Sequence, residues 1–80
     1  MKLPRDLDAD ELIRQLKQFG YVPTRQTGSH IRLTRVSEEG EHHITIPNHS
    51  PLRVGTLNNV LNDITNHIKM SKEDLLKRIT

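Results

Sequence analysis

The sequence contains no cysteine, which excludes a disulfide framework and a thiolate metal site. Its beginning has no apolar run that could serve as a signal peptide, and no stretch approaches the length of a membrane span. Its 4 glycines are isolated, so no glycine-rich loop matches a nucleotide-binding fingerprint. From these absences we expect a cytoplasmic protein with no cofactor and no membrane partner.

The chain has 80 residues, enough for one domain, which we expect to span residues 1–80. A domain of this size buries roughly 60% of the surface of its unfolded chain, so its core is small. The composition is polar, with 28% charged and 32% hydrophobic residues. The apolar residues nevertheless recur in regular patterns, which argues against disorder.

Positive charge is concentrated in one part of the chain, although the net charge is only +2. No acidic residue lies between Leu12 and Ser37, whereas this segment carries Arg14, Lys17, Arg25, Arg32 and Arg35. Such a basic stripe is compatible with a partner that bears phosphate groups. It is equally compatible with an ordinary solvated surface.

The first element is a predicted helix of about three turns that begins near Asp8. Asp8 can act as N-cap and Glu11 can complete a capping box, while Leu7 packs onto Leu12 as a hydrophobic staple. Gly20 supplies the C-terminal stop. The residues at helical spacing on its apolar face are Leu12, Ile13, Leu16 and Phe19.

Three short strands follow. They are predicted to span Tyr21–Gln26, His30–Val36 and Glu41–Pro47. Pro23 suits an edge position in the first strand because proline cannot donate to a ladder. We expect Thr27-Gly28 to form a two-residue turn and Ser37–Gly40 a four-residue hairpin loop.

These turns fix the pairing of the strands and the composition of the two faces of the sheet. Val22 falls opposite Leu33, Arg25 opposite His30, Leu33 opposite Ile44, and Ile31 opposite Ile46. The predicted apolar face therefore comprises Val22, Ile31, Leu33, Ile44 and Ile46, with Thr24 beside them. The predicted open face comprises Tyr21, Pro23, Arg25, His30, Arg32, Thr34, His43 and Thr45. This arrangement places His30 on the open face beside two arginines.

Helical patterns return after a loop over residues 48–55. Thr56 can cap a second helix, and Ser71 can cap a short closing helix. The apolar stripes of these helices are Leu57, Val60, Leu61, Ile64 and Ile68, and then Leu75, Leu76 and Ile79. The predicted fold is therefore α+β, in which two helices cover one face of a three-stranded antiparallel sheet and a short C-terminal helix follows.

The 5 histidines do not predict a metal site. His42 and His43 are adjacent in a strand and point to opposite faces, so they cannot bind one ion. His30, His43 and His49 could converge on the open face, but no cysteine or carboxylate completes a recognisable spacing. We expect His67 to lie on the surface and His42 to be a satisfied residue at the margin of the core.

Gly28-Ser29-His30 is the stretch most suggestive of chemistry. Ser29 is poorly placed as a nucleophile for His30, because neighbours on a strand diverge, and it is expected to order the turn. Cleavage of an RNA phosphodiester requires a base for the 2′-hydroxyl proton and cations for the charge that develops on phosphorus. His30 with Arg25 and Arg32 could supply both. The residues alone also allow His30 to be an ordinary polar residue beside a turn.

Several ordered motifs resemble the HicA toxin family, the small mRNA interferases of HicA–HicB toxin–antitoxin pairs. They are Phe19-Gly20-Tyr21, Arg25-Gln26-Thr27-Gly28-Ser29-His30, Ile44-Thr45-Ile46-Pro47-Asn48-His49 and Val54-Gly55-Thr56-Leu57. The resemblance covers nearly the whole chain. The segment from Asn62 to Met70 departs from compact members, because it lengthens the second helix or its following turn.

The resemblance implies a double-stranded-RNA-binding-domain-like α-β-β-β-α fold and ribosome-independent cleavage of mRNA. It implies that His30 is the catalytic residue and that a HicB antitoxin covers the active face. On this hypothesis Arg25 and Arg32 hold the scissile phosphate, and Gly28-Ser29 shape the turn. His43 and His49 are candidates for a second proton transfer. The predicted RNA-binding residues are therefore Arg25, Gly28, Ser29, Arg32, His43 and His49.

Two other classes of function stay open at this point. A non-catalytic RNA-binding module could use the same fold and basic face to read the shape of an RNA duplex, without an essential histidine. A domain for protein interaction would make the basic stripe incidental. The Gly28-Ser29-His30 motif favours the nuclease, because a module that reads shape does not require it.

Overall fold

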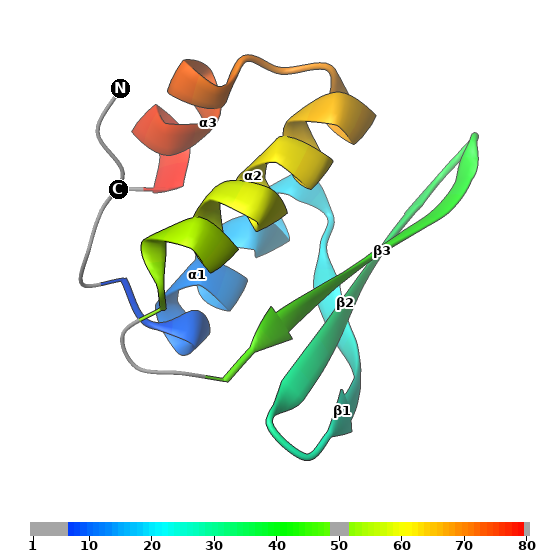
Figure 1. Cartoon of the computed structure of the whole chain (residues 1–80). Coiled ribbons are helices and arrows are strands. Elements are labelled where there is room, and N and C mark those ends of the chain that lie inside the picture. The colour runs from blue at the N-terminus through cyan, green and yellow to red at the C-terminus, as the bar shows by residue number, and fades with distance from the viewer. Residues whose placement is uncertain (1–6, 49–51, 80) are drawn as a thin grey trace.

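The computed structural model describes residues 7–48 and 52–79. Its elements are, in chain order, α1 (Ala9–Leu16), the short 3-10 helix η1 (Lys17–Phe19), β1 (Val22–Thr27), β2 (His30–Ser37), β3 (Gly40–Pro47), α2 (Val54–Ile68) and α3 (Lys72–Ile79) (Figure 1). None of the described helices has the length and apolar character needed to cross a membrane.

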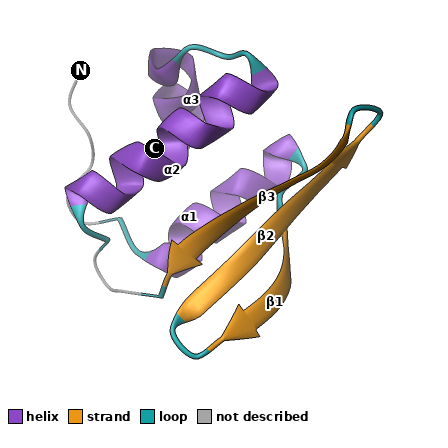
Figure 2. Ribbon diagram, turned by 45° about the vertical axis from the view of Figure 1, so that its right-hand side comes forward, coloured by secondary structure: helices purple, strands orange, loops and turns teal. Residues whose placement is uncertain are grey.

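The strands form one antiparallel sheet in the order β1-β2-β3, with β2 in the middle. Helices α1 and α2 cover one face of this sheet, and α3 packs on the two helices away from the strands (Figure 1). The opposite face of the sheet has no described element over it (Figure 2). The predicted α+β architecture is confirmed, including the edge position of β1, the strand that contains Pro23.

One hydrophobic cluster joins the helices to the inner face of the sheet. Its sheet residues are Ile31, Leu33, Ile44 and Ile46, as the alternation of apolar residues predicts. The predicted stripe of α2 is also confirmed: Leu57, Val60, Leu61 and Ile64 are buried, and Ile68 packs at the margin. From the closing helix α3, Leu75, Leu76 and Ile79 complete the same cluster.

The pairing of β2 with β3 has the predicted register. Leu33 lies opposite Ile44 and Ile31 opposite Ile46, and the ladder continues to Ser37 opposite Gly40. The tip of this hairpin is therefore two residues long, shorter than the expected four-residue loop.

The pairing of β1 with β2 differs from the prediction. The turn consists of Gly28-Ser29, so Thr27 rather than Arg25 lies opposite His30, and Arg25 lies opposite Arg32. Further along, the register shifts at a bulge between Pro23 and Arg25. A bulge inserts an extra residue and interrupts the strict alternation of faces on which the prediction depended.

Two residues next to this irregular region lie where the prediction did not put them. Tyr21 is completely buried (0% exposed), whereas Val22 is 46% exposed. The bulge separates these two residues from the rest of β1 and exchanges their faces: Val22 lies opposite Thr34 of the open face, and Tyr21 lies on the helix side. Its hydroxyl oxygen lies 2.7 Å from Nδ1 of His42, which satisfies the polar end of a buried ring.

The helix ends confirm some of the predicted caps. Asp8 occupies the predicted N-cap position of α1, but its side chain makes no capping hydrogen bond. Glu11 does not complete a capping box, because its carboxylate pairs with Arg14 and accepts a hydrogen bond from Gln15. The Ser71 hydroxyl accepts the Asp74 N–H at 3.1 Å at the start of α3, as predicted.

Helix α2 begins three residues earlier than expected. Its N-cap is Arg53 in an extended conformation, not Thr56, and the Arg53 carbonyl accepts the Leu57 N–H at 2.9 Å. The helix continues to Ile68 and ends at Lys69, whose φ of 57° is left-handed. Residues 62–68 therefore belong to the helix itself, and Lys69 and Met70 follow it.

Candidate active site

His30 is the first residue of the middle strand, and both neighbouring strands hold its backbone. Thr27 lies opposite it on β1 and Pro47 opposite it on β3. The His30 side chain therefore projects from a part of the sheet that is paired with a strand on both sides. It lies at the end of the sheet that contains the Gly28-Ser29 turn.

The turn itself is held by two hydrogen bonds. The Asn48 N–H donates to the Ser29 carbonyl at 2.6 Å, and the Gln26 side-chain amide donates to the Gly28 carbonyl at 3.4 Å. Gly28 has a φ of 58°, a left-handed conformation that glycine adopts without steric cost. Gly28 and Ser29 thus fix the chain direction from which β2 and His30 start.

A shallow pocket of about 180 Å³ surrounds the His30 side chain on the open face. Its lining residues are Arg25, Thr27, His30, Arg32 and Thr45. All five are exposed, and no described residue forms a hydrogen bond with the His30 imidazole. Both ring nitrogens are therefore available to a ligand that enters the pocket.

Two guanidinium groups share this pocket because Arg25 and Arg32 lie directly opposite each other on β1 and β2. Like charges at opposed positions of a sheet destabilise it. Among residues 7–48 and 52–79, no carboxylate forms an ion pair with either arginine. An anion placed between the two side chains would relieve their repulsion and accept hydrogen bonds from both.

A hydrogen-bonded row crosses the same face next to the arginines. The Thr34 hydroxyl lies 2.8 Å from that of Thr24 and 2.9 Å from Nδ1 of His43. His43 Nε2 lies 3.5 Å from a carboxylate oxygen of Glu41. His43 thus occupies the predicted face, but its ring is held by neighbours whereas that of His30 is not.

The other described histidines and Arg35 lie on the helix side of the sheet. Arg35 Nε donates to the Phe19 carbonyl at 2.9 Å, and Arg35 Nη1 donates to Nε2 of His67 at 3.4 Å. The rings of His42 and His67 stack with their centroids 4.1 Å apart. The prediction for His42 is confirmed, since it is half-buried with partners at both nitrogens.

The prediction that His67 lies plainly on the surface is wrong, because it packs between Arg35 and His42. The predicted basic stripe is also not continuous. Arg35 is half-buried behind the sheet, and Arg14 pairs with Glu11, so only Arg25 and Arg32 adjoin His30. Sequence alone could not reveal the contacts of His67 with Arg35 and His42, because they join β2 and β3 to the end of α2.

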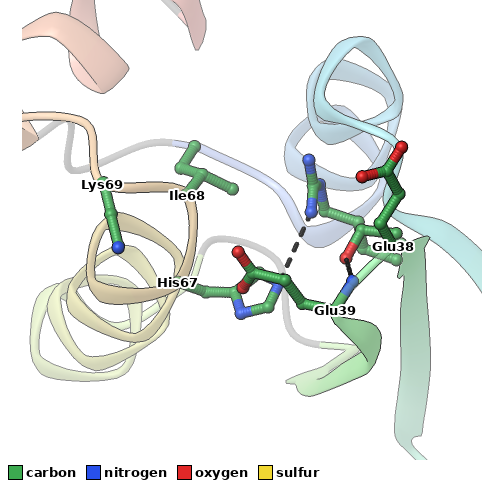
Figure 3. A pocket seen from close by; sticks show the side chains of 7 residues that line it. Glu38, Glu39, His67, Ile68 and Lys69 are labelled. Atoms are coloured by element: carbon green, nitrogen blue, oxygen red, sulfur yellow. Dashed lines mark hydrogen bonds between the residues drawn. The ribbon is translucent and has the colours of Figure 1, made fainter.

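A larger hollow of about 360 Å³ lies at the other end of β2, between the β2–β3 turn and the end of α2 (Figure 3). Glu38 and Glu39 border it from the turn, and His67, Ile68 and Lys69 border it from the helix (Figure 3). It is lined by both acidic and basic groups, so it has no clear preference for an anion or a cation. It is remote from His30 and on the opposite side of the sheet.

His49 lies outside the described residues. Within the described part of the chain, no three histidine, aspartate or glutamate side chains are grouped so that they could hold a metal ion. The candidate site therefore consists of His30, Arg25 and Arg32, with Thr27 and Thr45 at the rim.

The fold and this pocket define a small α+β domain whose open sheet face carries a histidine beside two arginines, none of which forms an ion pair with another described residue. Residues 9–65, more than half of the chain, match the family model described as "HicA toxin of bacterial toxin-antitoxin". The chain belongs to the HicA toxin family. No curated protein and no solved structure gives a significant match. The matched range contains every residue of the pocket and ends before His67 and α3.

Proposed function

We propose that this toxin is an endoribonuclease that cleaves mRNA independently of the ribosome, with His30 as its catalytic residue. The observation that supports this most directly is the pocket, in which a free imidazole on a fixed strand faces two guanidinium groups without ion-pair partners among the described residues. RNA has a 2′-hydroxyl proton that the imidazole can accept and a negatively charged phosphate that the guanidinium groups can bind.

The proposed reaction uses the 2′-hydroxyl of the RNA as its nucleophile. His30 takes the 2′-hydroxyl proton while the oxygen attacks the adjacent phosphorus, and the 5′-oxygen of the next nucleotide leaves. Arg25 and Arg32 hold the phosphate and stabilise the negative charge that develops on its oxygens. The 5′-oxygen receives a proton from the protonated imidazole or from water. No covalent enzyme intermediate forms.

Other parts of the site have supporting roles in this proposal. Gly28 and Ser29 fix the turn that positions His30, and the backbone at this turn lies close to the bound RNA. His43 also contacts the RNA, but it pairs with Thr34, four residues from His30 along β2. At about 3.3 Å per residue this separation is about 13 Å, so His43 acts on a different part of the strand.

Cleavage of a labelled RNA by wild-type protein and by His30→Ala tests the catalytic role. We expect the substitution to lower the rate at least about 100-fold, the lower range for the loss of a general acid–base group. An RNA with 2′-deoxyribose at the mapped cleavage site should resist the wild-type enzyme. Circular dichroism and thermal unfolding verify that both proteins are folded.

Two results would contradict the proposal. Equal cleavage by folded His30→Ala would exclude this residue as the catalyst. Cleavage at the 2′-deoxy position would exclude the 2′-hydroxyl as the nucleophile.

A third result would decide between classes of function. If the wild-type protein binds RNA without cutting it, the domain is a non-catalytic RNA-binding module with the same basic face. Lys17→Ala is the matched control, because Lys17 is exposed on η1 and outside the pocket.

As a toxin of a toxin–antitoxin system, the protein requires a partner that restrains it. We propose that this partner is a HicB-like antitoxin that covers the open face of the sheet. Such a protein would block the pocket directly and would present acidic groups to Arg25 and Arg32.

A further inference from the structure

The side chains on the open face, most of them polar, form three rows that cross all strands. The first row contains Thr27, His30 and Pro47, and the second contains Arg25, Arg32 and Thr45. The third row contains Thr24, Thr34 and His43. Along β2 and β3 successive rows are about 6.6 Å apart, because each is two residues further along the strand. This separation is similar to the repeat of one nucleotide in an extended single strand. On β1 the bulge places Thr24, one residue beyond Arg25, in the third row beside Val22, the register partner of Thr34.

The third row is held together by hydrogen bonds between its side chains. Thr34 is the one buried polar residue in the described part of the chain, with 6% exposure, although it belongs to the open face. Its hydroxyl is held between Thr24 on β1 and His43 on β3. The bulge between Pro23 and Arg25 turns Thr24 to this face, where regular alternation would have placed it toward the helices.

This row fixes the orientation of the His43 ring. The Thr34 hydroxyl occupies Nδ1, and the Glu41 carboxylate lies at Nε2. The His43 side chain is nevertheless 36% exposed. Because both nitrogens have neighbours in the protein, the part of the ring that remains available to a ligand is its flat face.

No other aromatic ring apart from His30 is available on this face within the described residues. Tyr21 is fully buried on the helix side, and Phe19 packs against the core. Proteins that bind single-stranded RNA stack bases on aromatic side chains, including histidine, beside a positively charged groove. Here the arginine row is the positive groove, and His43 is the ring beside it.

We propose that His43 is a stacking platform for a nucleobase next to the scissile phosphate, and that Thr34 is the positioning residue that holds its ring. The proposal rests on the assignment of single-stranded RNA as the substrate of the neighbouring pocket. With the phosphate held by Arg25 and Arg32, one row away, the base of an adjoining nucleotide reaches His43.

The test measures binding of uncleaved RNA in a His30→Ala background by fluorescence anisotropy. The probes are a single-stranded RNA of mixed sequence and a fully abasic strand of the same length. We expect His43→Ala to weaken binding of the base-bearing RNA about fivefold to tenfold, the lower end of the contribution of base–aromatic stacking. Binding of the abasic strand should change less than about twofold, and His43→Phe should retain the affinity for base-bearing RNA.

Thr34 variants test the positioning role independently. Thr34→Val removes the hydroxyl and should weaken binding of base-bearing RNA when residue 43 is histidine. It should have no effect in the His43→Phe protein, whose ring makes no hydrogen bond to Thr34. Thr34→Ser keeps the hydroxyl and is the matched control for folding, which is followed by thermal unfolding.

Two outcomes would overturn the proposal. If His43→Ala weakens both strands equally and His43→Phe does not rescue, the contact is to phosphate and no base is stacked. If His43→Ala has no effect on either strand, the subsite does not exist. Failure of the proposed nuclease activity is separable, since a protein with intact His30 that binds in a His43-dependent way without cutting RNA would retain the subsite and lose only the activity.

Discussion

Arg25 and Arg32 show at the level of single residues how the proposed site opposes the stability of the fold. They face each other across β1 and β2, and no described carboxylate forms an ion pair with either one. Two exposed guanidinium groups in opposed positions repel each other. A bound phosphate converts this repulsion into attraction, so the pair favours the complex over the free protein.

Removal of one arginine should therefore change stability and RNA binding in opposite directions. We expect Arg32→Gln to raise the free energy of unfolding by about 0.2–1 kcal/mol, measured by urea denaturation at low salt. RNA affinity should fall, and the slope of log affinity against log salt should decrease by about 0.7 for the one phosphate contact that is lost from a single strand.

Lys17→Gln provides the comparison, because it removes the same charge from an exposed site outside the pocket. Its salt slope should match that of the wild-type protein. A loss of stability in Arg32→Gln would show that the guanidinium has a structural partner and would contradict the repulsion argument.

Tyr21 gives the fold a defined response to alkaline pH. Burial raises the pKa of Tyr21 to about 12, while Arg35 acts in the opposite direction and Asp63 adds to the rise. An unfolded tyrosine titrates near pH 10. Between about pH 10 and 12 the unfolded chain therefore loses this proton first, and the free energy of unfolding falls as pH rises.

The comparison of wild type with Tyr21→Phe isolates this effect. At neutral pH the variant should be about 1 kcal/mol less stable, because His42 loses its hydroxyl partner. Above pH 10 only the wild-type protein should show a fall in its free energy of unfolding from this proton, of roughly 2–3 kcal/mol by pH 12. A constant difference from pH 7 to 12 in denaturation experiments would contradict the assignment.

At the level of elements, alternation and helical spacing were sufficient to predict most of the core. Ile31, Leu33, Ile44 and Ile46 recur with period two, and burial of one face follows from that pattern. Hence β2, β3 and α2 were predictable, and so was the open face that carries His30. The pairing of β2 with β3 followed from the position of the loop, because a turn centred on Glu38-Glu39 gives the same register whether it is two or four residues long.

The errors of prediction concentrate where a local irregularity or a distant contact decides the outcome. The Gly28-Ser29 turn brings Arg25 opposite Arg32 instead of His30, and the bulge between Pro23 and Arg25 then places Val22 opposite Thr34 instead of Leu33. No period in the sequence encodes an inserted residue. Contacts such as that of Arg35 with His67 depend on how α2 crosses the sheet, so spacing along the chain could not reveal them.

Helix α3 lies outside the matched range of the family but belongs to the core of this protein. Leu75 is completely buried in the same cluster as the residues of α1 and α2. We expect Leu75→Ala to lower the free energy of unfolding by about 2–5 kcal/mol, because it leaves a cavity in a small core. Thermal unfolding followed by circular dichroism measures this loss.

Lys77 is the matched control on the same helix. Its ion pair with Glu73 is highly exposed, with side-chain exposures of 71% and 72%. Lys77→Ala should therefore change the stability by less than about 0.5 kcal/mol. If Leu75→Ala were equally mild, α3 would be an appendage that does not support the sheet.

At the level of the whole molecule, the two faces of the sheet have separate tasks. The helices bury the apolar residues of β2 and β3 on one face, and the other face carries the pocket, the arginine row and the His43 row without any described element over it (Figure 2). On the two proposals made above, RNA and the antitoxin bind the same surface.

This shared surface predicts strict competition between RNA and antitoxin. A saturating amount of the proposed HicB-like antitoxin should abolish binding of RNA by the His30→Ala protein in anisotropy experiments, without formation of a ternary complex. Because the competing surface is cationic, Arg25→Ala with Arg32→Ala should weaken the antitoxin complex more at low salt than at high salt. Lys77→Ala, on α3, should leave the complex unchanged. A stable ternary complex would place the antitoxin on another surface and would mean that it restrains the toxin without covering His30.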